Sequence, residues 1–198
     1  MPSTAMPDLE LLKPARVHEA TGTARRTFAL ALAGRLDGAV LWIHDISTPE
    51  MLYAPGIAAF LDPARLLLAQ PKGPLSILQT MEEALRSGAV ALVIAELCEA
   101  PGLTESRRLQ LAAGTGGGRG VCLIPESKLR SNAAETRWSC NPLPGGGNVR
   151  QHWEIVKNKR GRLGRWRVKW DGARFVEEVT DLEVIQDRHL RSGDPVRF

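Results

Sequence analysis

The amino-acid sequence predicts an α/β protein with a doubly wound, mostly parallel sheet that ends in a C-terminal antiparallel hairpin. Before residue 125, short and continuous apolar runs alternate with helical segments. This order is typical of a parallel sheet with helices on both faces. From residue 136 onward, apolar and polar residues alternate and glycine-rich turns separate the segments, as in antiparallel strands.

Four apolar runs are the predicted parallel strands. They read GAVLWI, RLLLAQ, AVALVIA and GVCLI and lie at residues 38–43, 65–70, 89–95 and 120–124. Each run is continuous rather than alternating, which indicates strands whose two faces are both covered.

Three helices are predicted around these strands. The clearest has Pro74 just inside its start and Gly88 just past its end. Its predicted buried face consists of Leu75, Leu78, Met81 and Leu85. A helix after residues 19–26 carries the stripe Phe28, Leu32 and Leu36. The third helix covers residues 103–113 and has Thr104 as its predicted N-cap.

The C-terminal part contains three predicted antiparallel strands, with the sequences TRWSC, QHWEIV and GRWRVKW. Side chains on a strand point alternately to opposite faces. In the last strand, one face therefore carries Trp166, Val168 and Trp170. The other face carries Arg165, Arg167 and Lys169. The hairpin is expected to have one aromatic face and one cationic face.

Positive charge is concentrated in this C-terminal part. Residues 126–170 contain eleven Lys and Arg against three Asp and Glu, a balance of +8, whereas the whole chain has a net charge of +4. Basic residues beside tryptophans suit phosphate attraction and base stacking. The candidate nucleic-acid-binding residues are Lys157, Lys159, Arg160, Arg162, Arg165 and Arg167. A solvated turn whose tryptophans face the core is the alternative interpretation.

Composition argues against several classes of protein. The three cysteines, Cys98, Cys122 and Cys140, lack CxxC spacing, and the histidines lack i,i+4 pairs, so neither a disulfide framework nor a metal site is predicted. Cys98 and Cys122 are expected to be small core residues. The run AVALVIA is far shorter than the roughly 18 residues of a membrane span, and the first residues lack a secretion signal. We therefore expect a cytoplasmic protein without metal, cofactor or membrane contact.

Residues 19–33, EATGTARRTFALALA, have the outline of a phosphate-binding loop that runs into a helix. Such a loop reads GxxxxGK[ST]. If Arg26 occupies the Lys position, Ala20 and Arg25 occupy the positions of the two glycines. Side chains there disfavour the left-handed backbone angles and the close approach of phosphate that glycine permits. We expect no ATP hydrolysis, and nucleotide binding without turnover is the alternative. In the absence of a nucleotide, the side chains of Arg25 and Arg26 are expected to be solvated.

The chain resembles a known family. LYAPGIAAFLDPARLLLAQP and MEEALRSGAVALVIAEL resemble the middle of the RecA recombinase core, and LTESRRLQLAA, TRWSC and GRWRVKWD resemble more closely the ImuA family. These are RecA-like proteins encoded in bacterial damage-inducible mutagenesis cassettes. The resemblance extends from about His18 to Asp171. It implies an N-terminal segment 1–17, a RecA-like domain 18–171 with a basic hairpin at 150–170, and an acidic tail 172–198 that we expect to be mobile.

The resemblance also assigns the residues of the ATPase machinery. The metal-supporting Asp of the true ATPases falls on Glu96. The catalytic Glu falls on Ile46, which cannot accept a proton or orient water, so hydrolysis is not expected. His44 and Asp45, next to this position, lie at a predicted strand end where α/β sheets bind ligands.

The function implied by the resemblance is that of a non-catalytic accessory protein in error-prone translesion DNA synthesis during the bacterial SOS response to DNA damage. The implied partners are the catalytically inactive Y-family polymerase-like protein and the error-prone replicative-type polymerase of the same cassette. RecA and single-stranded DNA are further candidates. The alternatives are a SulA-type cell-division inhibitor, which is also a P-loop-deficient relative of RecA, and a divergent RecA-like ATPase.

Overall fold

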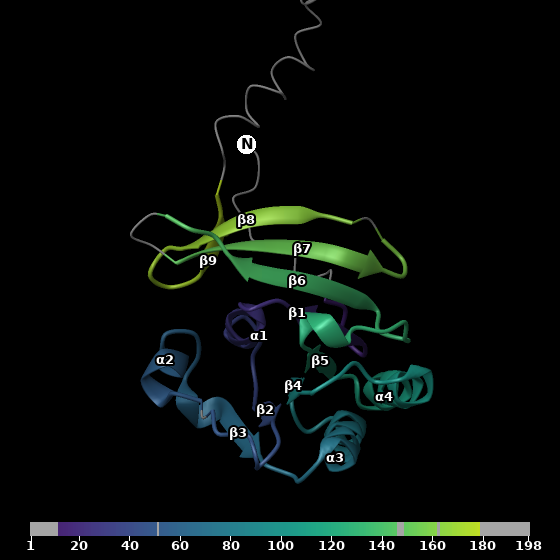
Figure 1. The fold of residues 1–198 in the computed structure, drawn as a ribbon. Helices are drawn as coiled ribbons and strands as arrows, with labels where there is room; N and C mark the ends of the chain where they lie inside the picture. The colour runs from purple at the N-terminus through teal and green to yellow at the C-terminus, as the bar shows by residue number, and fades with distance from the viewer. Residues whose placement is uncertain (1–11, 51, 146–148, 162, 179–198) are drawn as a thin grey trace, which may run out of the picture.

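The computed structural model describes residues 12–50, 52–145, 149–161 and 163–178, which form a single nine-stranded sheet with helices on both faces (Figure 1). The strand order is β3-β2-β4-β5-β1-β6-β7-β8-β9. The parallel strands are β1 (Val17–Thr21), β2 (Val40–Ile43), β3 (Leu66–Ala69), β4 (Leu92–Glu96) and β5 (Arg119–Leu123). The prediction of a RecA-like, doubly wound, mostly parallel sheet is confirmed.

The antiparallel part is larger than the predicted hairpin. β6 (Thr136–Pro142) pairs in parallel with β1, and β7 (Arg150–Asn158), β8 (Arg165–Trp170) and β9 (Phe175–Glu177) follow it in antiparallel order. β9 lies inside the segment 172–198 that was expected to be a mobile tail. This part of the segment joins the sheet, because Phe175 is buried against Trp153 and Trp170. The rest of that tail, residues 179–198, lies outside the described residues.

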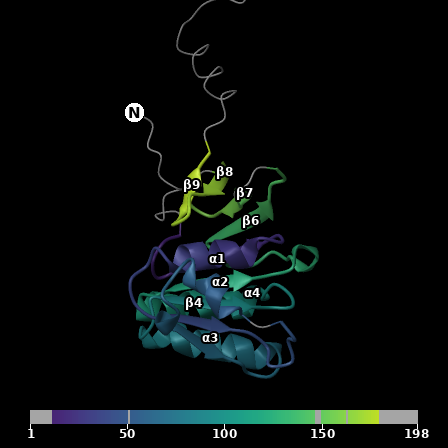
Figure 2. The same cartoon turned by 90° about the vertical axis from the view of Figure 1, so that its left-hand side faces the viewer.

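Two helices cover each face of the parallel strands. α1 (Arg25–Ala33) and α2 (Ala54–Ala58) lie on one face, which is turned toward the viewer in Figure 2. α3 (Pro74–Ser87) and α4 (Leu103–Gly116) lie on the other. In the described part of the chain, every helix is too short or too polar to span a membrane.

An aromatic cluster joins α1 to the antiparallel strands. The Phe28 ring lies 5.2 Å from the Trp138 ring and 5.0 Å from the Trp153 ring, between centroids. On β8, Trp166 and Trp170 pack against this core, whereas Arg165 and Arg167 are exposed. The predicted aromatic and cationic faces of the hairpin are confirmed, and the aromatic face is directed inward.

Two predicted burial patterns are wrong in part. The buried stripe of α3 is Ile77, Met81 and Leu85, whereas Leu75, in the first turn, is 65% exposed. β3 is the last strand at its edge of the sheet, so Leu67 and Leu68 remain 50% and 47% exposed. The second apolar run is therefore not covered on both faces.

Two further expectations near α4 are corrected. Cys98 is exposed rather than buried, because it lies in the connection between β4 and α4 and not in a strand. Cys122, inside β5, is buried as predicted. α4 begins at Leu103 with Gly102 at its N-cap, so the cap lies two residues before the predicted Thr104.

Candidate functional site

The connection between β1 and α1 is too short to be a phosphate-binding loop. β1 ends at Thr21 and α1 begins at Arg25, so only Gly22–Ala24 connect them. Ala20, expected at a loop glycine position, lies inside β1 and pairs with neighbouring strands on both sides. Gly22 has φ +86°, and a Cβ atom there would lie 2.2 Å from the carbonyl oxygen of Cys140. The tight turn is therefore packed directly against β6.

The backbone amides of this turn already have acceptors within the protein. The pairs are Thr23 N–H with Asn141 Oδ1 (3.4 Å), Ala24 N–H with the Cys140 carbonyl (3.0 Å) and Arg25 N–H with the Gly22 carbonyl (3.4 Å). A phosphate-binding loop needs these N–H groups free to point at its ligand. In this structure they stabilise the turn instead.

Arg26, expected at the position of the loop Lys, forms an internal ion pair with Glu96, expected at the position of the metal-supporting Asp. Its Nε and one terminal nitrogen donate to Glu96 Oε2 at 2.9 and 2.7 Å, and its other terminal nitrogen lies 2.5 Å from Glu50 Oε2. The remaining oxygen, Glu96 Oε1, accepts the indole N–H of buried Trp42 at 2.8 Å. The two residues expected at the phosphate-binding and metal-supporting positions are thus bonded to each other.

The electrostatics of this ion pair favour the charged arginine. Partial burial lowers the pKa of Arg26, but the hydrogen bonds and negative charges of Glu96 and then Glu50 raise it overall. An arginine side chain stays protonated in proteins, so the ion pair persists at physiological pH. Because two carboxylates already neutralise the guanidinium, little positive charge remains for a phosphate group. Arg26 is accordingly not the solvated side chain expected from the sequence.

Asp45, which follows β2, stabilises the local structure through hydrogen bonds to backbone amides. The Asp45 carboxylate accepts the amide hydrogens of Ser47 at 2.7 Å and of Gly73 at 2.6 Å. Hydrogen bonds from the side chain and backbone of Ser47, and then from Gly73, lower the pKa of Asp45. These bonds tie the end of β2 to the start of α3. Ile46, at the position of the catalytic Glu, is 58% exposed and has no group that could orient water.

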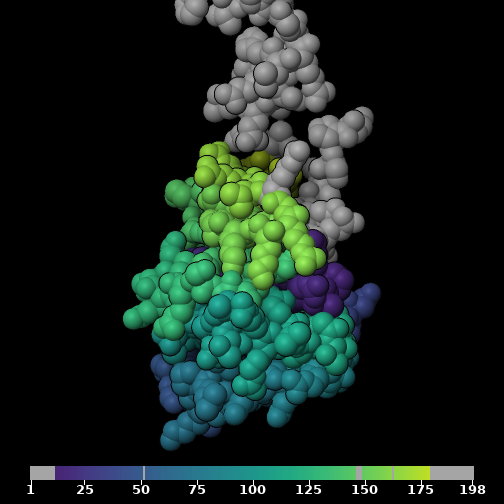
Figure 3. Space-filling view, turned by 90° about the vertical axis from the view of Figure 1, so that its right-hand side faces the viewer, coloured from purple at the N-terminus to yellow at the C-terminus, as the bar shows by residue number. Residues whose placement is uncertain are grey.

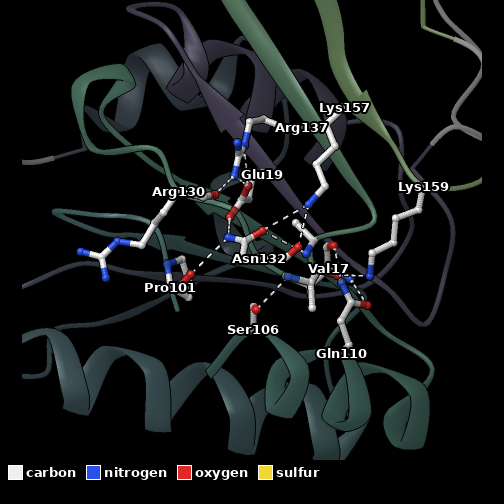
Figure 4. Close-up of polar contacts among 12 residues, drawn as sticks. Val17, Glu19, Pro101, Ser106, Gln110, Arg130, Asn132, Arg137, Lys157 and Lys159 are labelled. Atoms are coloured by element: carbon white, nitrogen blue, oxygen red, sulfur yellow. Dashed lines mark hydrogen bonds and ion pairs between the residues drawn. The ribbon is translucent and has the colours of Figure 1, made fainter. Parts of the chain in front are cut away.

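A buried polar cluster lies beneath β6 (Figure 4). Glu19, in β1, is 2% exposed, and its Oε2 accepts from Arg137 Nε at 2.7 Å. Its other oxygen accepts from the side-chain amide of Asn132. The Lys157 ammonium donates to the Asn132 carbonyl at 2.8 Å, and burial lowers the pKa of Lys157. Of these four residues, only Lys157 is predicted from the sequence, because the large sequence separation of Glu19, Asn132 and Arg137 hides the cluster.

The six predicted nucleic-acid-binding residues do not form one patch. Lys157 belongs to the buried cluster, and the Lys159 ammonium donates to the Ala133 carbonyl at 2.7 Å. Arg160 is exposed in the turn after β7, and Arg162 lies outside the described residues. Arg165 and Arg167 are exposed on β8, where Arg165 Nε lies 2.7 Å from Glu154 Oε1. The structure therefore divides the described members among the buried cluster, the β7–β8 turn and the outer face of β8.

Comparison with known proteins identifies the family. No protein-family model matches the chain. The chain is 32% identical over 200 aligned residues to Protein ImuA of Caulobacter vibrioides strain NA1000 / CB15N, with 86% of this chain and 80% of the relative covered. The identity and coverage are the same for Protein ImuA of strain ATCC 19089 / CIP 103742 / CB 15. With this identity over most of both chains and a RecA-like sheet, the chain belongs to the ImuA family, which connects it to bacterial SOS mutagenesis.

Proposed function

We propose that this protein is a non-catalytic accessory factor of error-prone translesion synthesis, which acts in the bacterial cytoplasm by binding other macromolecules. The observation that carries this proposal is the Arg26–Glu96 ion pair at the position of the ATP site. Phosphoryl transfer depends on free amides, a free cation and a metal that together stabilise the phosphates. Here the amides and the cation are bonded to the protein itself, which supports a role that uses no nucleotide.

Its proposed protein partners are the inactive Y-family polymerase-like protein and the error-prone replicative-type polymerase of the same cassette, with RecA as a further candidate. Family membership supports this proposal, because the cassette encodes these proteins together. The β3 edge of the sheet offers a surface for such a partner: Leu67 and Leu68 are 50% and 47% exposed on a strand whose outer edge has no neighbour among the described strands. Sheet edges of this kind pair readily with another chain.

Affinity capture from DNA-damaged cells tests this partnership. The wild-type protein is expected to retrieve the two cassette polymerases, and Leu67→Glu is expected to weaken their capture about tenfold, because a charge replaces an apolar anchor. Leu103→Glu is the matched control, since Leu103 is also 50% exposed but lies on α4. Equal losses for both variants would remove the β3 edge from the proposal. Capture of tubulin-like FtsZ in place of a polymerase would favour a division inhibitor.

Single-stranded DNA is the proposed nucleic-acid partner. Arg165, Arg167 and Lys169 are exposed side by side along the outer face of β8, which no described helix covers. Cations on an exposed face of a β-strand attract phosphates but make no specific contacts with the bases. Binding to DNA is therefore expected to be weak and independent of base sequence. The tryptophans of this region pack inward, so the proposal does not include base stacking on them.

A further inference from the structure

A cleft of about 400 Å³ separates α4 from the turn that follows β7. Four side chains from three parts of the chain bring positive charge to it: Arg16 before β1, Arg107 on α4, and Lys159 and Arg160 in the turn. Figure 3 looks onto this side of the molecule, where yellow-green side chains of the β7–β8 region reach toward the teal residues below them, beside the purple start of the described chain. Arg16 and Arg107 are not among the site residues that the sequence predicts.

The cleft has excess positive charge. Four cations and one carboxylate, that of Glu135, line it, which leaves a balance of +3. The Glu135 side chain is only 5% exposed, and each of its oxygens lies 3.9 Å from a cation, one from Lys13 Nζ and the other from Arg16 Nε. Within residues 12–50, 52–145, 149–161 and 163–178, Arg107 and Arg160 have no ion-pair partner. Both are exposed and available to an anion.

The floor of the cleft is held in place by hydrogen bonds (Figure 4). The Gln110 side-chain amide donates to the Val17 carbonyl at 2.7 Å and to the Ala133 carbonyl at 3.1 Å. The Lys159 ammonium donates to the same Ala133 carbonyl at 2.7 Å. An ammonium group has three N–H donors, so this bond positions Lys159 and leaves two donors for a ligand.

The size and lining of the cleft suit a phosphate within a longer molecule. Phosphate oxygens accept several charge-assisted hydrogen bonds, which guanidinium and ammonium groups donate. The cleft volume of about 400 Å³ exceeds what one phosphate group needs, and Leu111 on its wall is 72% exposed. This apolar side chain provides a surface on which a sugar or base can pack.

We propose that this cleft binds a phosphodiester group of a single-stranded nucleic acid, with Arg107 and Arg160 as its direct contacts and Lys159 as a positioned third donor. The inference rests on the proposed DNA-binding role. The cleft, next to α4, would be a second contact for single-stranded DNA besides the cations along β8.

Fluorescence anisotropy of a labelled oligothymidylate at several salt concentrations tests the proposal. Each lost phosphate contact reduces the magnitude of the log–log salt slope by about 0.7 for single strands, so an Arg107→Gln, Arg160→Gln variant is expected to lose about 1.4. Arg108→Gln is the matched control, because Arg108 is the next residue on α4 but pairs with Glu82 and does not line the cleft. Its slope is expected to stay within about 0.3 of the wild-type slope.

The outcomes separate the cleft from the wider proposals. Unchanged slopes in the Arg107→Gln, Arg160→Gln variant, together with a reduced slope in an Arg165→Gln, Arg167→Gln variant, would overturn the cleft and leave DNA binding on β8. Wild-type protein without salt-dependent binding would overturn both DNA proposals, whereas partner capture is measured independently. Inorganic phosphate or thymidine monophosphate at equal ionic strength is expected to displace the oligonucleotide far more weakly than unlabelled oligothymidylate does. Displacement by either as strong as that by oligothymidylate would identify a small anion as the ligand and overturn a nucleic-acid site. Unchanged thermal transitions in all variants exclude unfolding as the cause.

Discussion

Replacing Arg137 with Met is expected to lower the free energy of unfolding by about 3 to 5 kcal/mol. The Arg137 and Glu19 side chains are 13% and 2% exposed, and their charged atoms lie 2.7 Å apart. The variant leaves the Glu19 carboxylate buried without its cation, and a buried charge that loses its partner is strongly destabilising. Urea denaturation followed by circular dichroism measures the effect.

Two further variants identify the cause of this loss. Arg130→Met removes a surface ion pair with Glu99 in which both side chains are 51% exposed, and it is expected to cost less than about 1 kcal/mol. Adding Glu19→Gln to Arg137→Met removes the unpaired charge and is expected to restore much of the lost stability. Equal destabilisation by Arg137→Met and Arg130→Met would contradict a special contribution from the buried pair.

Lowering the pH is expected to destabilise the fold by about 3 kcal/mol through His18 alone, at about 1.4 kcal/mol for each unit of pKa shift. Burial lowers the pKa of His18 from 6.5 to about 4, against an opposing hydrogen bond to the Lys13 carbonyl. The folded protein therefore favours the neutral imidazole, whereas the unfolded chain binds a proton below pH 6.5. This contribution to stability is fully present above pH 6.5 and is lost as the pH falls toward 4.

The hydrogen bonds around His18 explain why the neutral ring fits. The Trp138 indole N–H donates to Thr136 Oγ1 at 2.9 Å, and Thr136 Oγ1 lies 2.8 Å from His18 Nδ1. With the Thr136 hydroxyl as donor, Nδ1 accepts, and the ring donates from Nε2 to the Lys13 carbonyl at 3.2 Å. A proton on Nδ1 would direct a second donor at the Thr136 hydroxyl and break this chain of donors and acceptors.

The measurement for His18 is urea denaturation at pH 7.5 and pH 4.5. The difference in stability between these two conditions is expected to shrink by about 2.5 to 3 kcal/mol in His18→Gln. His152→Gln is the control, because it also removes a histidine but one on β7 that takes no part in the hydrogen bonds around His18. A pH dependence in His18→Gln equal to that of the wild type would refute the assignment.

Among the parallel strands, the sequence predicts those that are continuous apolar runs and omits β1, the central strand of the sheet. β2, β4 and β5 were predicted because their runs of apolar residues are continuous. β1 has the sequence VHEAT, in which His18, Glu19 and Thr21 are polar, yet all five residues are buried. His18 and Glu19 depend on partners in β6, more than a hundred residues away along the chain. Hydrophobic periodicity contains no information about such pairs, so β1 could not be found by that signal.

The contacts made by the candidate site residues could not be predicted from local sequence patterns either. The sequence predicts that Arg26 lies at the start of a helix and Glu96 at the end of a strand, because both are local features. It could not show that the two residues bind each other, or that Lys157 and Lys159 donate to the protein's own carbonyls. A basic residue in a sequence looks the same whether its acceptor is a phosphate or a backbone oxygen. Arg16 and Arg107 meet in one cleft only through the fold.

The most direct test of the account is a calorimetric titration of magnesium-ATP into the purified protein, followed by a hydrolysis assay on the same sample with and without single-stranded DNA. Because the turn amides and Arg26 are already bonded within the protein, the account predicts no saturable heat of binding and no phosphate release above background. Saturable binding accompanied by turnover, with both lost in Arg26→Ala, would contradict it.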